Sequence, residues 1–311
     1  MKFAALDLGT NTSLLLIVET QGGGQPPRVL CDEVRITRLG QEVQSTRRLH
    51  PEALQRAADC FAEFKALIDH HQVNIVRACT TSAARDAVNG QDFIQLGARY
   101  GIPIEIISGE REAALTFLGS LESAKQEWTA VIDVGGGSTE IVIGDTKGPC
   151  ERVSLNVGSV RLTEKFITGH PISAEELERL IQFVRQEVSR ALDQFNLIPA
   201  QVLLVAGTPT TLASVELGRA FESELVHGHR MELSTLERWV HRLAGMSIEE
   251  RKQLGGMEPK RADVIVAGAV CLMEALRGLQ QTEARVSIRG LRYGIAMDLI
   301  ASQFGPSGAS R

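Results

Sequence analysis

V-I-D-V-G-G-G-S-T-E-I-V-I, residues Val131 to Ile143, is the stretch around which this chain is organised. An apolar run ends in Asp133, turns through three consecutive glycines, and continues through Ser138 and Thr139 into a second apolar run. This pattern predicts two short buried strands joined by a glycine turn. Glycine permits positive φ and brings backbone N–H groups close to a ligand without a Cβ in the way. A nest of such amides is typical of a phosphate site.

The same pattern occurs near the start of the chain. Residues Ala5 to Ile17 read A-L-D-L-G-T-N-T-S-L-L-L-I and align with the central stretch without a gap. Two copies predict two related halves. The aligned pairs are Asp7 with Asp133, Gly9 with Gly135, Thr12 with Ser138 and Ser13 with Thr139.

A phosphate site must be weighed against an ordinary hairpin turn. Asp-x-Gly is common in hairpins, so one copy alone favours a purely structural turn. The gapless pair and the triple glycine favour phosphate binding. If both turns face a shared cleft, Asp7 and Asp133 would hold a divalent metal that bridges phosphate oxygens.

Bulk composition limits the function classes. The chain has 311 residues, enough for two domains, with 43% hydrophobic and 23% charged residues, as in ordinary soluble proteins. A net charge of −5 argues against a nucleic-acid binder, although a polyanionic ligand responds to local charge. A homodimer is left open.

The cysteines and the apolar runs indicate a cytoplasmic protein. Five scattered cysteines without a C-x-x-C pair fit reduced thiols. No run of eighteen apolar residues occurs, so no membrane span is expected. Asp7 interrupts the N-terminal apolar run, which argues against a signal peptide.

Helix signals recur between the glycine turns. An amphipathic helix is predicted from Pro51, and another over Ala262 to Leu276 that is apolar along most of its length. A strand over Val202 to Ala206 should end in a third glycine-hydroxyl turn, Gly207 and Thr208. Three capping boxes are predicted: Ser173 with Glu176, Ser234 with Glu237, and Ser247 with Glu250.

Several charged residues have two interpretations. Glu112 lies in the first turn of a predicted helix, where the helix dipole alone explains an acid, but a carboxylate there could also position a water. Hydroxyls before Arg85 can cap a helix or bind an anion. The arginine-rich stretch 28–48 is a solvated loop or a phosphate clamp. His227 and His229 favour loop packing or phosphate contact over a metal site.

These residues resemble the phosphate loops of the actin, heat-shock chaperone ATPase and sugar kinase superfamily. More closely, the chain resembles the exopolyphosphatase and guanosine pentaphosphate phosphohydrolase family. The segments that carry this resemblance run from end to end: I-T-R-L-G (36–40), A-C-T-T-S-A-A-R-D-A-V-N (78–89), I-I-S-G-E-R-E-A (106–113), D-V-G-G-G-S-T-E, L-N-V-G-S-V-R-L-T-E-K-F, V-H-G-H, P-K-R-A-D-V-I-V-A-G (259–268) and G-L-R-Y-G.

The resemblance implies an α/β fold of two ribonuclease-H-like, actin-like ATPase domains with a central cleft. We expect an N-terminal domain over 1–122 and a C-terminal domain over 123–297. Whether the last helix, about 298–311, packs back on the N-terminal domain is left open.

The resemblance also implies the chemistry. Family members hydrolyse the terminal phosphoanhydride of inorganic polyphosphate, or the 5′ end of guanosine pentaphosphate, with Mg²⁺. Glu112 falls on the expected catalytic base and Asp133 on the acid beside the glycine loop, with Asp7 as a second metal ligand. The substrate-binding candidates are Gly9, Thr10, Asn11, Thr12, Arg38, Arg85, Gly135, Gly136, Gly137, Ser138, Gly207, Thr208, Arg261 and Arg289, and Arg35 and Arg292 are further candidates to neutralise the phosphate chain.

Three residues depart from the family pattern, and the first two of them put substrate preference, not the chemistry, in doubt. Tyr293 stands where the family has Glu, Ala206 replaces the first of a glycine pair, and Arg111 interrupts the acids around Glu112. The less favoured alternatives are an ATP-dependent kinase or actin-like ATPase, and a non-catalytic alarmone-binding protein. The sequence does not rank polyphosphate against guanosine pentaphosphate.

Overall fold

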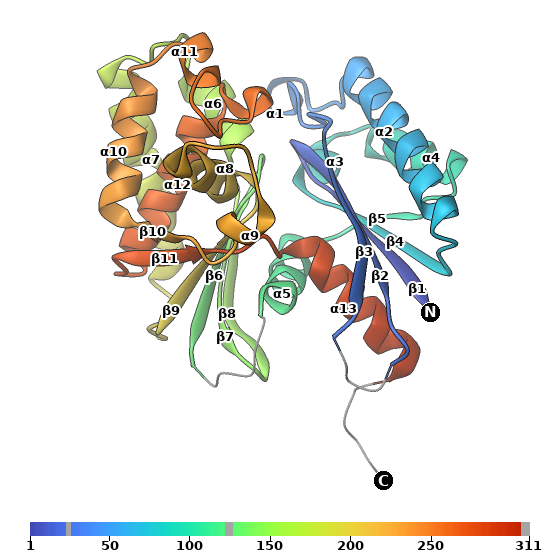
Figure 1. The fold of residues 1–311 in the computed structure, drawn as a ribbon. Helices are drawn as coiled ribbons and strands as arrows, with labels where there is room; N and C mark the ends of the chain where they lie inside the picture. Colours follow the sequence, from blue (N-terminus) through green and yellow to red (C-terminus); the bar gives the residue numbers. More distant parts are fainter. Residues whose placement is uncertain (23–25, 122–126, 306–311) are drawn as a thin grey trace. The chain divides into compact units, whose positions relative to one another are not determined.

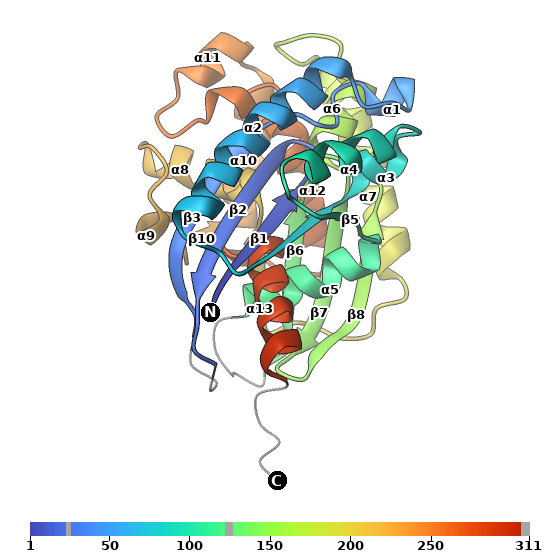
Figure 2. The same cartoon turned by 90° about the vertical axis from the view of Figure 1, so that its right-hand side faces the viewer.

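A computed structural model describes residues 1–22, 26–121 and 127–305. Contacts within the chain divide it into two compact units, Met1–Gly119 with the residues from Leu291 onward, and Ser120–Gly290. Each unit is a sheet with helices packed on it (Figures 1 and 2). The domain boundary predicted between 122 and 123 and the end of the predicted helix 298–311 lie outside the described residues.

The first unit is built on a five-stranded sheet in the order β3-β2-β1-β4-β5. Strand β1 pairs antiparallel with β2 and parallel with β4, β2 pairs antiparallel with β3, and β4 pairs parallel with β5. The strands are β1 Lys2–Leu8, β2 Thr12–Glu19, β3 Arg28–Ile36, β4 Ile75–Thr80 and β5 Ile104–Ile106.

Alternating residues of β1 supply both faces of this sheet, as the period of a strand requires. Ala4 and Leu6 join the core under α2 and α4, whereas Phe3 and Ala5 join the core under α5 and α13. The sheet is therefore covered on both sides (Figure 2). The helices are α1 Val43–Thr46, α2 Pro51–His70, α3 Ser82–Asp86, α4 Gly90–Arg99, α5 Gly109–Ser120 and α13 Leu291–Phe304.

The C-terminal helix α13 packs on this first sheet and begins earlier than the predicted start at 298. It crosses α5 at a glycine: a Cβ on Gly294 would lie 1.8 Å from the carbonyl oxygen of Leu115. Asp298 of α13 also accepts from Arg77 at 2.5 Å and from Arg111 at 2.8 Å. Arg111, one of the three departures, is thus directed at α13.

The second unit repeats the topology of the first. Its six-stranded sheet has the order β10-β11-β9-β6-β7-β8. Strand β6 pairs antiparallel with β7 and parallel with β9, β7 pairs antiparallel with β8, and β9 pairs parallel with β11. Only β10, antiparallel to β11, is added. The strands are β6 Thr129–Val134, β7 Thr139–Asp145, β8 Gly148–Leu155, β9 Gln201–Val205, β10 Arg230–Glu232 and β11 Glu283–Val286.

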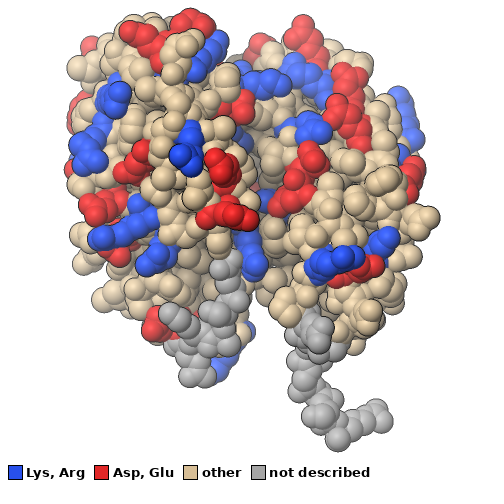
Figure 3. Space-filling model, viewed as in Figure 1, with Lys and Arg blue, Asp and Glu red and all other residues tan. Residues whose placement is uncertain are grey.

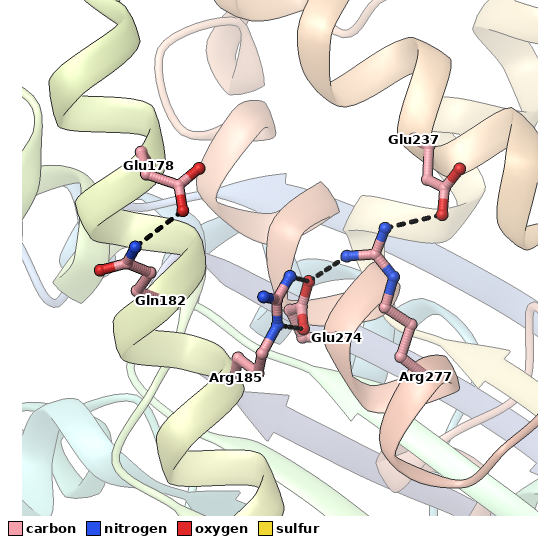
Figure 4. Close-up of polar contacts among 6 residues, drawn as sticks. All are labelled: Glu178, Gln182, Arg185, Glu237, Glu274 and Arg277. Carbon is pink, nitrogen blue, oxygen red and sulfur yellow. Dashed lines mark hydrogen bonds and ion pairs between the residues drawn. The ribbon is translucent and has the colours of Figure 1, made fainter.

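Helix α12 is the central helix of the second unit, buried over its length from Ile265 to Leu276 as its apolar sequence predicts. Its one acid, Glu274, is 2% exposed and bonds to Arg185 of α7 at 2.9 and 3.2 Å and to Arg277 (Figure 4). Arg277 in turn donates to Glu237 of α10 at 2.7 Å. This network ties three helices together.

The helices of the second unit are α6 Ser159–Phe166, α7 Ala174–Leu192, α8 Gly207–Leu217, α9 Ser223–Val226, α10 Leu233–Ala244, α11 Ile248–Lys252, the 3₁₀ helix η1 Pro259–Arg261 and α12 Ile265–Gly278. The predicted α/β fold with two halves of ribonuclease-H-like strand order is confirmed.

Two of the three predicted capping boxes are present, at Ser173 and Ser247. In the first, hydrogen bonds from Thr168 and Ser173 lower the pKa of Glu176 to about 2. The third prediction is wrong: α10 begins two residues earlier with Glu232 as N-cap, so Ser234 lies inside the first turn.

The surface charges are mixed, and the cysteines are reduced, as the composition predicts. Acidic and basic side chains are interspersed on the face shown in Figure 3. All five cysteines are free. Within the described ranges, no helix combines the length and hydropathy needed to cross a membrane.

Candidate phosphate-binding site

The two glycine turns have the same geometry. The amide of Gly9 donates to the carbonyl of Thr12 at 2.9 Å, and the amide of Gly135 donates to the carbonyl of Ser138 at 3.0 Å. In each turn, a Cβ on the glycine would lie 3.2 Å from the accepting oxygen. The sequence repeat is therefore a structural repeat, with one turn in each unit.

The first turn of helix α6 holds two carbonyls of the second glycine turn. The amide of Ser159 donates to the carbonyl of Gly135 at 2.9 Å. The amides of Val160 and Arg161 donate to the carbonyl of Gly136 at 2.8 and 3.0 Å. Backbone donors at the start of a helix have no partner in their own helix, so α6 can use them on its neighbour.

The next carbonyl of the turn is held by a side chain. Arg161 Nε donates to the carbonyl of Gly137 at 2.7 Å. Gly158 allows this close approach, because a Cβ there would lie 2.6 Å from backbone atoms of Gly136 and Gly137. The strand-turn segment before α6 therefore packs directly against the glycine turn.

These contacts fix the direction of three amides. In a trans peptide the C=O and the N–H point to opposite sides. Because the carbonyls of residues 135, 136 and 137 all point to α6, the N–H groups of residues 136–138 point away from it. Among the described residues these three N–H groups donate to no backbone carbonyl. The turn presents the row of donors that an anion needs.

The first turn is held by a different segment. The amide of Gly40 donates to the carbonyl of Thr10 at 2.7 Å, and the amides of Thr37 and Arg38 donate to the carbonyl of Asn11 at 3.1 and 3.0 Å. The amides of Asn11 and Thr12, which share peptides with these carbonyls, therefore point away from the 37–40 segment. Arg38 has a φ of 51°, in the left-handed region.

Asn11 carries a buried amide side chain in the first turn. The residue is 4% exposed, and within the described chain neither Oδ1 nor Nδ2 has a hydrogen-bond partner. Buried polar groups are usually paired, so such a group points to a ligand or water. The neighbouring Thr10 hydroxyl bonds to Ser82 at 2.8 Å, which ties the turn to the start of α3.

The second turn is flanked by two carboxylates. Asp133 of β6 lies directly opposite Glu140 of β7, so both side chains project from the same face of the sheet. Glu140 is 1% exposed and accepts from Ser154 at 2.6 Å. In the first unit, Asp7 lies opposite Leu14. Only the second copy carries a carboxylate pair.

Glu140 was missed in the sequence analysis, although the repeat contained the signal. It aligns with Leu14, and a buried acid at an otherwise apolar strand position is unusual. Two carboxylates on one face fit a divalent cation whose other ligands are water and phosphate. No three Asp, Glu, His or Cys side chains form a metal-ligand group in the described part of the chain.

Glu112 lies in the first turn of α5 in the first unit and is 7% exposed. Arg85 Nη1 lies 3.8 Å from its Oε2, which is an ion pair longer than a hydrogen bond, and donates to the carbonyl of Ile107 at 3.1 Å. Ser108 caps this helix turn by accepting from the amide of Arg111 at 3.2 Å. The structure therefore brings two predicted site residues, Glu112 and Arg85, together.

The third turn begins helix α8. Ala206 has φ 77° and ψ −169°, a region that only glycine enters readily. The Arg261 guanidinium lies against Gly207, because a Cβ there would be 2.1 Å from it. Burial lowers the pKa of Arg261 to about 10, and Glu258 acts in the opposite direction. Thr208 is buried, and a Cβ on Gly268 of α12 would lie 2.5 Å from its hydroxyl oxygen.

Two other predicted phosphate contacts, Arg35 and Arg292, are paired with acids. Arg35 pairs with Glu33 at 2.8 Å and with Glu63 at 2.7 Å. Arg292 makes a two-point pair with Asp32 at 2.8 and 3.0 Å. Their role toward substrate stays a prediction.

Other residues that the sequence singled out also have partners. Tyr293, another departure, donates to Asp32 at 3.1 Å. The amide of Arg289 donates to the hydroxyl of Ser287 at 3.2 Å. His229 bonds to Glu216 at 2.9 Å, and His227 accepts from the amide of Ile288 at 3.4 Å, in line with the predicted loop packing.

The candidate residues thus divide between the units. The first unit holds Asp7, Gly9, Thr10, Asn11, Thr12, Arg38, Arg85 and Glu112, and the second holds Asp133, Gly135, Gly136, Gly137, Ser138, Gly207, Thr208, Arg261 and Arg289. That both sets face one cleft stays a prediction.

Comparison with known proteins agrees with this geometry. The model of the Ppx/GppA phosphatase family matches residues 16–303. The chain is 36% identical to exopolyphosphatase 2 of Mycobacterium tuberculosis, with 96% of this chain and 98% of that protein covered. It is 28% identical to the guanosine-5′-triphosphate,3′-diphosphate pyrophosphatase of Vibrio vulnificus, where 96% of this chain covers 59% of the longer protein.

Solved structures show the same similarity. A Ppx/GppA family member from Aquifex aeolicus has 30% identity and a TM-score of 0.80, with 97% of this chain and 98% of that chain covered. An exopolyphosphatase from Cytophaga hutchinsonii has 26% identity and a TM-score of 0.87, with the same coverage.

Proposed function

Because the chain belongs to the Ppx/GppA phosphatase family, we propose that it is an exopolyphosphatase. The family makes it a phosphoanhydride hydrolase, and its substrate in this proposal is the end of an inorganic polyphosphate chain. Water attacks the terminal phosphorus, the terminal P–O anhydride bond breaks, and orthophosphate and a chain shorter by one phosphate are released. The single observation that carries the proposal is the row of oriented amides at residues 136–138 beside the carboxylate pair.

The amides of both turns would bind the terminal phosphates. Phosphoryl transfer requires positioning and charge stabilisation more than covalent chemistry, and fixed N–H donors supply both. The amides of residues 136–138 are held by α6, and those of Asn11 and Thr12 by the 37–40 segment. Arg38, Arg85 and Arg261 are the arginines that we assign to the rest of the phosphate chain.

Divalent-metal dependence is general in this family, and we assign the ion as Mg²⁺ at Asp133 and Glu140. Their position on one face of β6 and β7 fits a hard cation that takes oxygen ligands. When bound, Mg²⁺ would neutralise charge on the phosphate oxygens. Asp7 is the weaker ligand candidate, because the residue opposite it is Leu14.

Glu112 would act as the general base toward the attacking water. Its carboxylate is buried at the start of α5, and Arg85 Nη1 lies 3.8 Å from its Oε2. We expect Glu112→Gln to lower kcat steeply, by about 10²-fold or more, with a small change in KM. Glu110→Gln, on the same helix turn, serves as the control. Near-normal turnover by Glu112→Gln would remove Glu112 from this role.

The second candidate substrate is guanosine pentaphosphate, hydrolysed at its 5′ end. The relative from Vibrio vulnificus, which carries that activity in its name, favours it. The deciding assay offers purified protein and Mg²⁺ either long polyphosphate or guanosine pentaphosphate and measures orthophosphate. Polyphosphate turnover without nucleotide supports the proposal. ATP-dependent transfer to an acceptor, or tight alarmone binding without turnover of either substrate, would contradict it.

A further inference from the structure

We propose that Arg161 is a positioning residue of the second glycine turn, which orients and polarises the Ser138 amide without touching substrate. The proposal rests on the phosphate-binding role assigned to that turn. It assigns a role to a residue that sequence patterns did not single out.

Arg161 contacts the turn at two successive carbonyls. Its backbone amide donates to the carbonyl of Gly136 at 3.0 Å, and its side-chain Nε donates to the carbonyl of Gly137 at 2.7 Å. The second contact fixes the peptide between Gly137 and Ser138, and that peptide carries the last N–H of the row. With three glycines in succession, the turn has little stiffness of its own, so its orientation depends on such outside contacts.

The contact with Gly137 also brings a positive charge. Hydrogen bonds from an ionised donor are roughly twice as strong as neutral ones. A carbonyl that accepts such a bond makes the N–H of the same peptide a better donor, because bonds in a chain polarise one another. Ser138 is 2% exposed, and in such a shielded place this polarisation is screened little. The Arg161 guanidinium, bound to the Gly137 carbonyl, therefore makes the Ser138 N–H a stronger hydrogen-bond donor.

The first turn has an arginine one peptide further away, on helix α2. Arg56 of α2 donates through Nε to the carbonyl of Thr37 at 2.8 Å. The next amide, that of Arg38, donates to the carbonyl of Asn11 at 3.0 Å, and the amide after Asn11 belongs to the row of the first turn. Both glycine turns thus have an arginine side chain in the hydrogen-bond chain that holds them, directly at Gly137 in the second turn and one peptide removed in the first.

Four variants separate this role from simple support of the fold: Arg161→Ala, Arg161→Gln, Arg161→Lys and the matched surface control Arg190→Ala. Gln keeps a neutral donor, and Lys keeps the charge. Arg190 lies on α7 of the same unit, and its side chain is 73% exposed and pairs with Glu187 at 2.9 Å. The measurements are pyrophosphate binding by calorimetry, KM and kcat with polyphosphate, and the unfolding temperature.

We expect Arg161→Ala to weaken pyrophosphate binding and raise KM by about tenfold, the equivalent of one charge-assisted hydrogen bond, with kcat changed by less than about threefold. Arg161→Gln should resemble Ala, Arg161→Lys should recover part of the loss, and Arg190→Ala should match the wild type. Wild-type binding and KM in Arg161→Ala or in Arg161→Gln, with only a lower unfolding temperature, would overturn the proposal. Failure of the proposed function is distinct, because the wild type would then release no orthophosphate.

Discussion

Replacing Ala206 by glycine should stabilise the protein, although most core and near-core substitutions destabilise. Ala206 precedes helix α8 with φ 77° and ψ −169°. An L-residue with a side chain is strained there, whereas glycine enters this region without a steric penalty. Ala206→Gly therefore relieves strain and leaves the backbone of the third turn unchanged.

The magnitude follows from three opposing terms. Backbone strain in such a region is about 1–3 kcal/mol. Glycine gives the unfolded chain more freedom, which costs about 0.5–1 kcal/mol, and loss of a half-buried methyl costs a few tenths more. The balance is an increase of about 1 kcal/mol in the free energy of unfolding. For a chain of this size it corresponds to roughly 2 °C in the unfolding temperature.

Differential scanning calorimetry tests this expectation with a control on the same helix. Ala213 is fully buried inside α8, so Ala213→Gly meets no strain to relieve and should lower stability by about 1 kcal/mol or more. The two substitutions are chemically identical and should change the unfolding temperature in opposite directions. A decrease for Ala206→Gly comparable to that for Ala213→Gly would refute the reasoning.

Two further substitutions test the packing of the second unit. Gly158→Ala should lower the free energy of unfolding by about 1–3 kcal/mol and weaken pyrophosphate binding, because its Cβ would lie 2.6 Å from the backbone of residues 136–137. Unchanged pyrophosphate binding in calorimetry would contradict this expectation. Glu274→Gln should lower the free energy of unfolding, measured by denaturant titration, by about 1–2 kcal/mol. The loss is smaller than for a fully buried pair because Arg185 is half exposed. The surface control Glu187→Gln should change the free energy of unfolding by less than about 0.5 kcal/mol.

The sequence predicted the features that depend on local pattern. The two glycine turns, the helix from Pro51 and the caps at Ser173 and Ser247 follow from periodicity, from glycine conformation and from side chains that reach three residues away. The Ser234 prediction failed although it uses the same local rule. Helix α10 starts two residues earlier, and Glu237 makes a tertiary contact instead, binding Arg277 of α12.

Features that depend on pairing between distant segments could not be predicted. Arg292, a substrate candidate, pairs with Asp32, 260 positions away. Arg111 looked like an interruption of an acidic site, but it binds Asp298 of the last helix. The role of Glu140 required the register between β6 and β7, which places it opposite Asp133. Each of these contacts is set by the topology of a sheet or by a helix returning to it.

The divergence of the two copies indicates how the chemistry is divided. Like charges directly opposite each other on neighbouring strands destabilise a sheet. The second copy nevertheless places Asp133 opposite Glu140, which is almost fully buried, whereas the first copy places Leu14 opposite Asp7. A hydrogen bond from Ser154 compensates part of that repulsion, and a bound cation would reduce it further. The same turn geometry thus supports a cation site in one copy, while the other copy offers the buried amide of Asn11, so we assign the metal to the second unit.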